Sequence, residues 1–321
     1  MAEAAPVEAA SLGFAELHVH LEGTLEPDLV RVLAGRNRMS IPDGHPALSR
    51  PVSGYRDLRQ FLDAYYGAMA VLRSETDFHD LAAAYFARAA RGGVVRAEIF
   101  FDPQAHLARG VPLEVILGGF SAAQVEAERN LGLASGLIAC FQRGLGEDAA
   151  EETFDRLLPF RDRLLGVGLV GAEVAGSTAP FARVFSRAAA EGLHRTAHAG
   201  QDGGPERVAE ALDLLGAERI DHGIRALEDP GVVARLRDEQ VPLTVCPLSN
   251  VRLGIVSSIE RHPLRRMLAA GLGVSVNSDD PAYFGAYLDD NLAALRSGLA
   301  FTDEEIAALA AASRAAVFVP A

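Results

Sequence analysis

Short apolar runs rich in β-branched and aromatic residues alternate along this chain with segments of helical periodicity, and the alternation repeats eight times. Several runs are continuous stretches of Val, Ile, Leu and Phe, which is typical of strands buried on both faces. Eight strand–helix repeats predict an α/β fold, a single closed (β/α)8 TIM-type barrel. The runs are Glu16–Leu21, Val94–Phe101, Leu133–Phe141, Leu164–Val170, Arg195–His198, Arg219–His222, Pro242–Cys246 and Gly273–Asn277.

The segments between the runs carry helix signals. In Pro205–Leu215 apolar side chains recur on one helical face. Another helix is predicted to open at Asp229-Pro230, where a capping residue precedes a proline in the first turn. An open doubly wound sheet is the alternative fold, but no G-x-G-x-x-G motif follows the first run to support it.

The chain has 321 residues, and a barrel of this kind needs about 250. We therefore expect one barrel domain over 14–321, with extra helices near its mouth, after a flexible tail over 1–13. The stretch Pro42–Asp63 is interpreted as an insertion that covers the mouth.

The net charge of −13 and the pI of about 5.2 argue against nucleic acid and against an anionic membrane surface as partners. The N-terminal stretch lacks a signal-peptide pattern, and no apolar run is long enough to span a bilayer. We expect a cytoplasmic protein whose two cysteines, Cys140 and Cys246, are reduced and buried. The charge sets no oligomeric state.

All basic side chains other than histidine are arginines, because the sequence contains no lysine. This excludes Schiff-base chemistry, a phosphate-loop lysine and a carboxylated lysine that bridges two metals.

Polar residues gather at the carboxyl ends of the predicted strands, where barrels of this type build their active sites. His18 and His20 are two residues apart, so both imidazoles should face the barrel interior. His198 ends the fifth run, and Asp279-Asp280 follows the eighth. Burying two adjacent carboxylates costs several kcal/mol each unless a cation or hydrogen bonds compensate. The set predicts one divalent metal, Zn²⁺ in the first instance, with Fe²⁺ or nickel as alternatives.

Five motifs follow one another along the chain: H-V-H-L-E-G at 18–23, H-A-G-Q at 198–201, D-H-G at 221–223, T-V-C-P-L-S-N at 244–250 and N-S-D-D-P at 277–281. Each motif alone is weak evidence, but the occurrence of all five in this order, one per strand, is specific for one family. From about residue 15 to its end the chain resembles the adenosine/adenine deaminase branch of the amidohydrolase superfamily. F-F-D-P-Q at 100–104, Glu22 in place of aspartate, and C-P-L-S-N at 246–250 resemble the adenine deaminases more than the nucleoside-specific adenosine deaminases.

The resemblance implies a one-metal site without a carboxylated lysine, and it assigns the ligands as His18, His20, His198 and Asp279. It implies that His222 orients the attacking hydroxide and stabilises charge beside it. The implied catalytic residues are His222, Gln201 and Asp279.

The resemblance also implies three substrate contacts. Asp280 would accept a hydrogen bond from N7 of the purine, and the backbone of Gly171 would approach N3. Glu22 would line the pocket where a nucleoside enzyme contacts ribose; the alternative is that Glu22 pairs with a nearby arginine. The loop 171–176 matches the family pattern only in part.

The remaining histidines are assigned no chemistry. We interpret His106 and His194 as structural, and we predict surface positions for His45, His79 and His262.

The implied reaction is zinc-dependent hydrolytic deamination of a 6-aminopurine, adenine or adenosine, to the 6-oxopurine and ammonia. The family's proton donor is a glutamate at the position of Gln201, and an amide cannot transfer a proton at neutral pH. Loss of a positioned general acid costs about 10²–10⁴ in rate. Two explanations are open: the glutamate was deliberately replaced, or glutamine is natural here and the enzyme is slow or acts on another substrate.

Two other functions are therefore kept beside the purine aminohydrolase. One is a deaminase of a modified adenine or an adenosine-derived metabolite. The other is a catalytically weak purine-binding protein, for which Gln201 is the support.

Overall fold

The computed structural model describes residues 11–41, 48, 58–173 and 177–319. Within them, one parallel sheet of eight strands runs in the order β1 to β8, which is also their order along the chain. A doubly wound sheet would reverse its strand order at a switch point, so the barrel prediction is confirmed. The strands are β1 Phe14–Glu16, β2 Val94–Phe101, β3 Ala134–Gln142, β4 Gly166–Val170, β5 His194–Ala199, β6 Arg219–His222, β7 Leu243–Val245 and β8 Val274–Val276.

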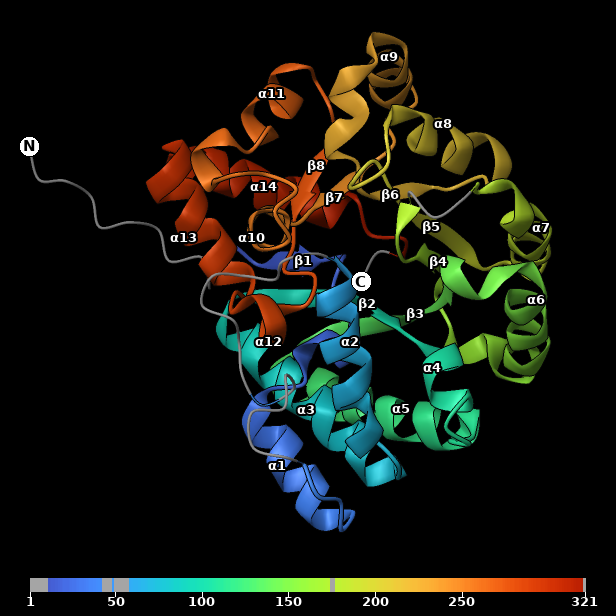
Figure 1. The fold of residues 1–321 in the computed structure, drawn as a ribbon. Coiled ribbons are helices and arrows are strands. Elements are labelled where there is room, and N and C mark those ends of the chain that lie inside the picture. The colour runs from blue at the N-terminus through green and yellow to red at the C-terminus, as the bar shows by residue number, and fades with distance from the viewer. Residues whose placement is uncertain (1–10, 42–47, 49–57, 174–176, 320–321) are drawn as a thin grey trace, which may run out of the picture.

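Helices surround the ring of strands (Figure 1). The main core lies between the two layers; Phe101 of β2, for example, packs edge-on against Phe120 of α5, with ring centroids 5.9 Å apart. The α-helices are α1 Pro27–Arg36, α2 Leu58–Ala68, α3 Glu75–Arg91, α4 Pro103–Leu107, α5 Leu113–Leu131, α6 Gly146–Leu157, α7 Ala182–Ala190, α8 Pro205–Leu214, α9 Pro230–Asp238, α10 Pro247–Arg252, α11 Leu264–Ala269, α12 Pro281–Phe284, α13 Leu288–Leu299 and α14 Asp303–Ala315.

Both helix predictions are confirmed. The segment from Pro205 forms α8, and α9 begins at Pro230. The carboxylate of Asp229 caps α9 by accepting from the backbone N–H groups of Gly231 and Val232.

The first strand is shorter and earlier than the predicted Glu16–Leu21. Regular pairing ends at Glu16, because the next N–H, that of Leu17, donates to the side chain of Asn277 at 2.7 Å instead of to a backbone carbonyl. Pairing then resumes as two isolated bridges, Val19 with Asp279 and His20 with Phe100.

Side chains close the seam between β1 and β8 below the functional end of the barrel. The buried carboxylate of Glu16 accepts from the backbone N–H of Ser278 at 3.2 Å and from its hydroxyl at 2.5 Å. The other oxygen of Glu16 accepts from the hydroxyl of Tyr85 at 2.7 Å. These bonds fix the residue directly before Asp279, so the seam positions a candidate site residue.

Two expected segments lie mainly outside the described residues. Of the predicted tail only residues 11–13 are described, and of the insertion Pro42–Asp63 only residue 48 and the start of α2. Both cysteines are free and buried, as expected. None of the described helices combines the length and the apolar character needed to cross a membrane.

We expect Tyr85→Phe to lower the free energy of unfolding by about 1.5–3 kcal/mol, because it removes a donor to a buried carboxyl group while it keeps the ring. Urea denaturation of the two proteins measures the difference. The control is Tyr287→Phe, which removes a donor to Glu26 at a partly exposed position, where water can replace it. Equal losses in the two variants would contradict a special role for the seam.

Candidate active site and metal centre

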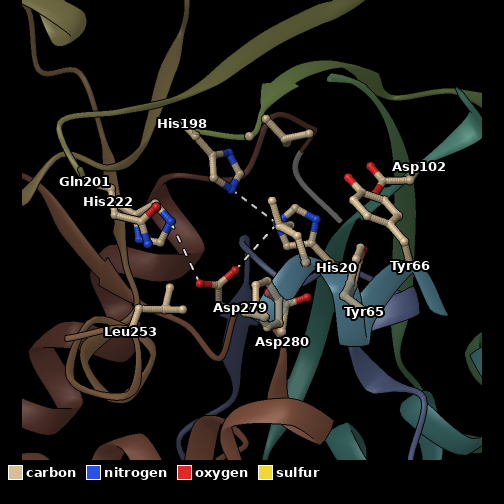
Figure 2. A pocket seen from close by; sticks show the side chains of 14 residues that line it. His20, Tyr65, Tyr66, Asp102, His198, Gln201, His222, Leu253, Asp279 and Asp280 are labelled. Atoms are coloured by element: carbon tan, nitrogen blue, oxygen red, sulfur yellow. Dashed lines mark hydrogen bonds and ion pairs between the residues drawn. The ribbon is translucent and has the colours of Figure 1, made fainter. Parts of the chain in front are cut away.

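A cavity opens at the carboxyl ends of the strands, with about 500 Å³ of empty space that is in part open to solvent. Strand-end residues form its floor, and helix α2 contributes aromatic and apolar side chains to its wall (Figure 2). Its lining includes His20, Gly171, His198, Gln201, His222, Asp279 and Asp280 from the strand ends, and Phe61, Leu62, Tyr65 and Tyr66 from α2.

The four residues predicted to bind a metal converge at this floor. Nε2 of His18 and Nε2 of His20 lie 3.4 and 3.5 Å from Oδ1 of Asp279. Nε2 of His20 also lies 3.2 Å from Nε2 of His198. All four side chains are buried, so ordinary solvation does not explain why so many polar atoms meet here.

The donor atoms fit a divalent cation. For bonds of about 2.1 Å, a tetrahedral site separates neighbouring ligand atoms by roughly 3.4 Å, which agrees with the observed distances. Nδ1 of His18 lies 3.1 Å from the carbonyl oxygen of Thr244, which can only accept, so Nδ1 carries the hydrogen. In the neutral ring Nε2 of His18 therefore offers a lone pair, and this nitrogen is buried without a hydrogen-bond partner.

Electrostatics keep the cluster ready for a cation. Burial and the neighbouring His198 lower the pKa of His20 to about 3, so its imidazole is neutral at pH 7. Burial opposes ionisation of Asp279, but the adjacent imidazoles outweigh it and hold the pKa of this carboxyl well below its usual range. Asp279 in turn outweighs burial and raises the pKa of His18, so the carboxylate lies between a neutral His20 and a His18 that favours positive charge, which is the charge that a bound cation would supply.

His222 also reaches Asp279 but faces its other oxygen. Oδ1 of Asp279 faces His18 and His20, whereas Oδ2 accepts from the hydroxyl of Ser249 at 2.5 Å and lies 3.9 Å from Nε2 of His222. By proximity alone, His222 falls in a group with His18, His198 and Asp279 whose atoms lie within 4.8 Å of one another. The division between the two oxygens separates His222 from the predicted ligands.

The backbone is strained at two of these residues. His222 and Asp279 both have φ of 67°, in the left-handed region, where a residue with a side chain costs about 1–2 kcal/mol. Each stands where the chain turns out of a strand end. Gly23 lies close to Asp280, a residue of the same site. A Cβ at position 23 would lie 2.0 Å from Oδ1 of Asp280, so a side chain there would clash with this carboxyl group.

A buried network supports the imidazoles from below. Asp221 accepts from the hydroxyls of Thr196 at 2.8 Å and Thr244 at 2.9 Å, and its Oδ2 lies 3.4 Å from Nδ1 of His198. Sequence reasoning assigned no role to Asp221 or Thr244, although both stand inside quoted motifs. The signal that could have found them is the strand period, which places Asp221 level with His198 on the neighbouring strand.

Gln201 is held by a residue that sequence reasoning also missed. The carboxylate of Glu173 accepts from three successive backbone N–H groups, those of Gly200 at 2.6 Å, Gln201 at 2.8 Å and Asp202 at 3.2 Å. These bonds fix the loop after β5, and the side chain of Gln201 lines the cavity beside His222 (Figure 2).

The predicted substrate residues do not all reach the cavity. Gly171 and Asp280 line it, whereas Glu22 is fully buried and stands outside the lining. Glu22 pairs with Nε2 of His106 at 2.7 Å, and Nδ1 of His106 accepts from Arg109 at 2.6 Å. The alternative of a direct arginine partner for Glu22 is thus replaced by an arginine that acts through a histidine.

The predictions for the remaining histidines have different outcomes. The surface prediction for His262 is wrong, because its side chain is enclosed with only 4% of the residue exposed. His79 is partly exposed on α3, and His45 lies outside the described residues. His194, at the far end of β5, stacks on Phe318 and pairs with Glu218.

We expect His18→Ala to purify without stoichiometric metal, because the variant loses a preformed lone pair. Elemental analysis of the dialysed protein measures its metal content. His194→Ala, which removes a histidine at the opposite end of the barrel, should keep its metal. Near-stoichiometric metal in His18→Ala would contradict the ligand assignment.

We expect Asp221→Asn to weaken metal affinity by about 10–100-fold, the usual effect of removing a carboxylate behind a ligating imidazole. Competition with a chromophoric chelator measures it. Asp213→Asn, at an exposed ion pair with Arg235, should leave the affinity unchanged. If the two variants bound metal equally well, Asp221 would have no supporting role.

Comparisons with known proteins agree with this geometry. The family model for adenosine deaminase matches residues 14–321. The chain is 52% identical to an adenine deaminase of Streptomyces coelicolor, over 95% of this chain and 90% of that protein.

Solved structures give the same result. The crystal structure of adenine deaminase from Arthrobacter aurescens is 49% identical, with a TM-score of 0.92 over 98% of this chain and 94% of that one. An amidohydrolase from Burkholderia ambifaria with bound Zn is 26% identical, with a TM-score of 0.89 over 97% of this chain and 87% of that one. The chain therefore belongs to the adenosine deaminase family.

Proposed function

We propose that this protein catalyses the hydrolytic deamination of adenine, releasing the 6-oxopurine and ammonia. The observation that carries the proposal is the convergence of three imidazoles and one carboxylate on the floor of a cavity whose wall offers aromatic side chains to a planar base. Relatives near 50% identity that bear the name adenine deaminase support adenine over adenosine. The two free, buried cysteines support a cytoplasmic location.

One zinc ion would be held by His18, His20, His198 and Asp279. Three imidazole nitrogens and one carboxylate oxygen suit zinc, and a Zn-bound amidohydrolase of the same fold supports it. When bound, the ion supplies a Lewis acid that makes water nucleophilic near neutral pH.

The remaining residues orient the reactants. Nε2 of His222 faces the centre and is proposed to orient the water that adds to C6. The backbone of Gly171 would lie against N3, and Asp280 would bond N7. Since N7 carries a lone pair and no hydrogen in the common form of adenine, the hydrogen of this bond belongs to the carboxyl group. That reverses the donor and acceptor expected from the resemblance.

Glu22 is proposed to act from behind the cavity wall. It accepts from the backbone N–H of Asp102, which does line the cavity, as well as from His106. Through Asp102 it would set the shape of the end where a nucleoside enzyme makes room for ribose.

Gln201 would face N1 and donate a hydrogen bond from its amide. A glutamic acid at this place would in addition deliver a proton, which the ring needs as water adds. The chain therefore has the geometry for the addition of water to C6 but lacks a side chain that can donate a proton to N1.

A panel of substrates separates the candidate functions. Ammonia release from adenine supports the proposal, and release only from N6-substituted purines or adenosine-derived compounds supports the modified-substrate alternative. Micromolar binding of purines without turnover supports a binding protein.

We expect Gln201→Glu to raise the turnover of adenine by at least tenfold, because the new carboxyl group can transfer a proton to N1. Ammonia release measured for both proteins under zinc-replete conditions tests it. The control is Gln104→Glu, at a buried glutamine that accepts from the backbone N–H of Gln142 and does not line the cavity; it should give no increase. An unchanged or lower rate in Gln201→Glu would count against the role assigned to position 201.

A further inference from the structure

A chain of hydrogen bonds runs from the backbone of α11 to His222 at the metal centre, through His262 and Asn250, to which the proposed function gives no role. The backbone nitrogen of Leu264 lies 3.2 Å from Nδ1 of His262, whose Nε2 lies 3.1 Å from Oδ1 of Asn250. Nδ2 of Asn250 lies 3.4 Å from Nδ1 of His222. Nε2 of His222 then faces Asp279 at 3.9 Å, as the dashed line in Figure 2 shows.

The donor and the acceptor of every bond in this chain of hydrogen bonds follow from the first bond, that of Leu264 to His262. A backbone N–H can only donate, so Nδ1 of His262 must be an acceptor without hydrogen. The hydrogen of the neutral His262 ring is then on Nε2, which donates to the carbonyl oxygen of Asn250. The amide nitrogen of Asn250 is left to donate to Nδ1 of His222, whose own hydrogen must stand on Nε2.

The opposite orientation of the Asn250 amide is excluded by the same argument. It would present an NH2 group to Nε2 of His262 while Leu264 donates to Nδ1, so that both ring nitrogens would accept. A neutral imidazole has one acceptor nitrogen.

Burial keeps water from replacing these partners. Asn250 is fully buried, and His222 and His262 are 1% and 4% exposed. Burial also lowers the pKa of His262 to about 4, so the ring is neutral at the pH where the protein is expected to work.

We propose that Asn250 and His262 are positioning residues that hold His222 as the tautomer with hydrogen on Nε2. This has two consequences at the centre. His222 presents a hydrogen-bond donor toward the oxygen that adds to the purine, and it has no lone pair there, so it does not become another metal ligand. The first consequence rests on the proposed function, whereas the tautomer itself does not.

A comparison within the site supports the proposal. His18 has the reverse arrangement, because its Nδ1 donates to the carbonyl oxygen of Thr244 and its Nε2 is left as a lone pair. A backbone carbonyl therefore sets the tautomer of a ligand, and a backbone N–H sets, through two side chains, the tautomer of the neighbouring donor.

The first test is spectroscopic. In zinc-loaded protein labelled with ¹⁵N-histidine, long-range ¹H–¹⁵N correlation distinguishes a nitrogen that carries hydrogen from one that does not. The His222 signals are assigned by their loss in His222→Gln. We expect a protonated Nε2 and an unprotonated Nδ1; the reverse pattern in the wild-type protein would overturn the proposal without any variant.

The second test is Asn250→Asp, which keeps the shape but replaces the donor with an acceptor. A carboxylate at position 250 would take a hydrogen from Nδ1 of His222, so the tautomer should reverse. We expect kcat for adenine to fall by about 10²–10³, the loss typical of one preorganised donor, with KM changed less than about threefold and bound zinc retained.

The control is Asn291→Asp, another buried amide on α13, which accepts from the backbone N–H of Leu248 and donates to the carbonyl of Tyr287. It should lower the melting temperature while kcat stays within about twofold and the His222 spectrum stays unchanged. A similar fall of kcat in both aspartate variants would assign the loss to packing and overturn the positioning role.

His262→Phe serves if Asn250→Asp does not fold. It frees the Asn250 amide to turn, so we expect a mixture of His222 tautomers and a loss of about tenfold in kcat. An unchanged spectrum in a folded variant of either residue would overturn the proposal. The predicted tautomers in a wild-type protein that deaminates no purine would instead reject the proposed function and leave the positioning intact.

Discussion

A buried carboxylate surrounded by imidazoles is the interaction on which the rest of this structure depends. Asp279 is enclosed at the carboxyl end of the barrel, and both of its oxygens are engaged: one faces His18 and His20, the other Ser249 and His222. A buried charge is stable only with partners of this kind. The parallel strands bring all of these partners to one rim, because every strand ends there.

The surrounding residues convert that cluster into a site with direction. Asp221 and Thr244 hold the imidazoles from below, Glu16 fixes the residue before Asp279, and Glu173 fixes the loop that carries Gln201. Each of these is a buried polar side chain that bonds backbone or a site residue. The left-handed conformations of His222 and Asp279 cost stability, and this dense network supplies the compensation.

Much of the fold and of the site could be predicted because both leave local signals. The runs that became β2 and β6 have the predicted bounds, and the Asp-Pro pair that opens α9 does cap it. The convergence of His18, His20, His198 and Asp279 could be expected because all four stand at strand ends, and the resemblance to the family named them together. The first strand was displaced because Asn277, 260 residues away from Leu17 along the chain, takes the place of a backbone partner. His262 was misjudged for a similar reason: nothing in the neighbouring sequence shows that the fold buries it and pairs it with Asn250.

The sequence by itself determined the order of strands, the fold class and the kinds of side chain at each strand end, since these depend on periodicity and on short motifs. Only the tertiary structure decided which nitrogen of each histidine faces the centre, which oxygen of Asp279 each partner takes, and that Glu22 stands behind the wall and not in the cavity. Those properties depend on hydrogen-bond partners that come from distant strands and helices, and a donor or acceptor far along the chain leaves no trace in the residues it orients.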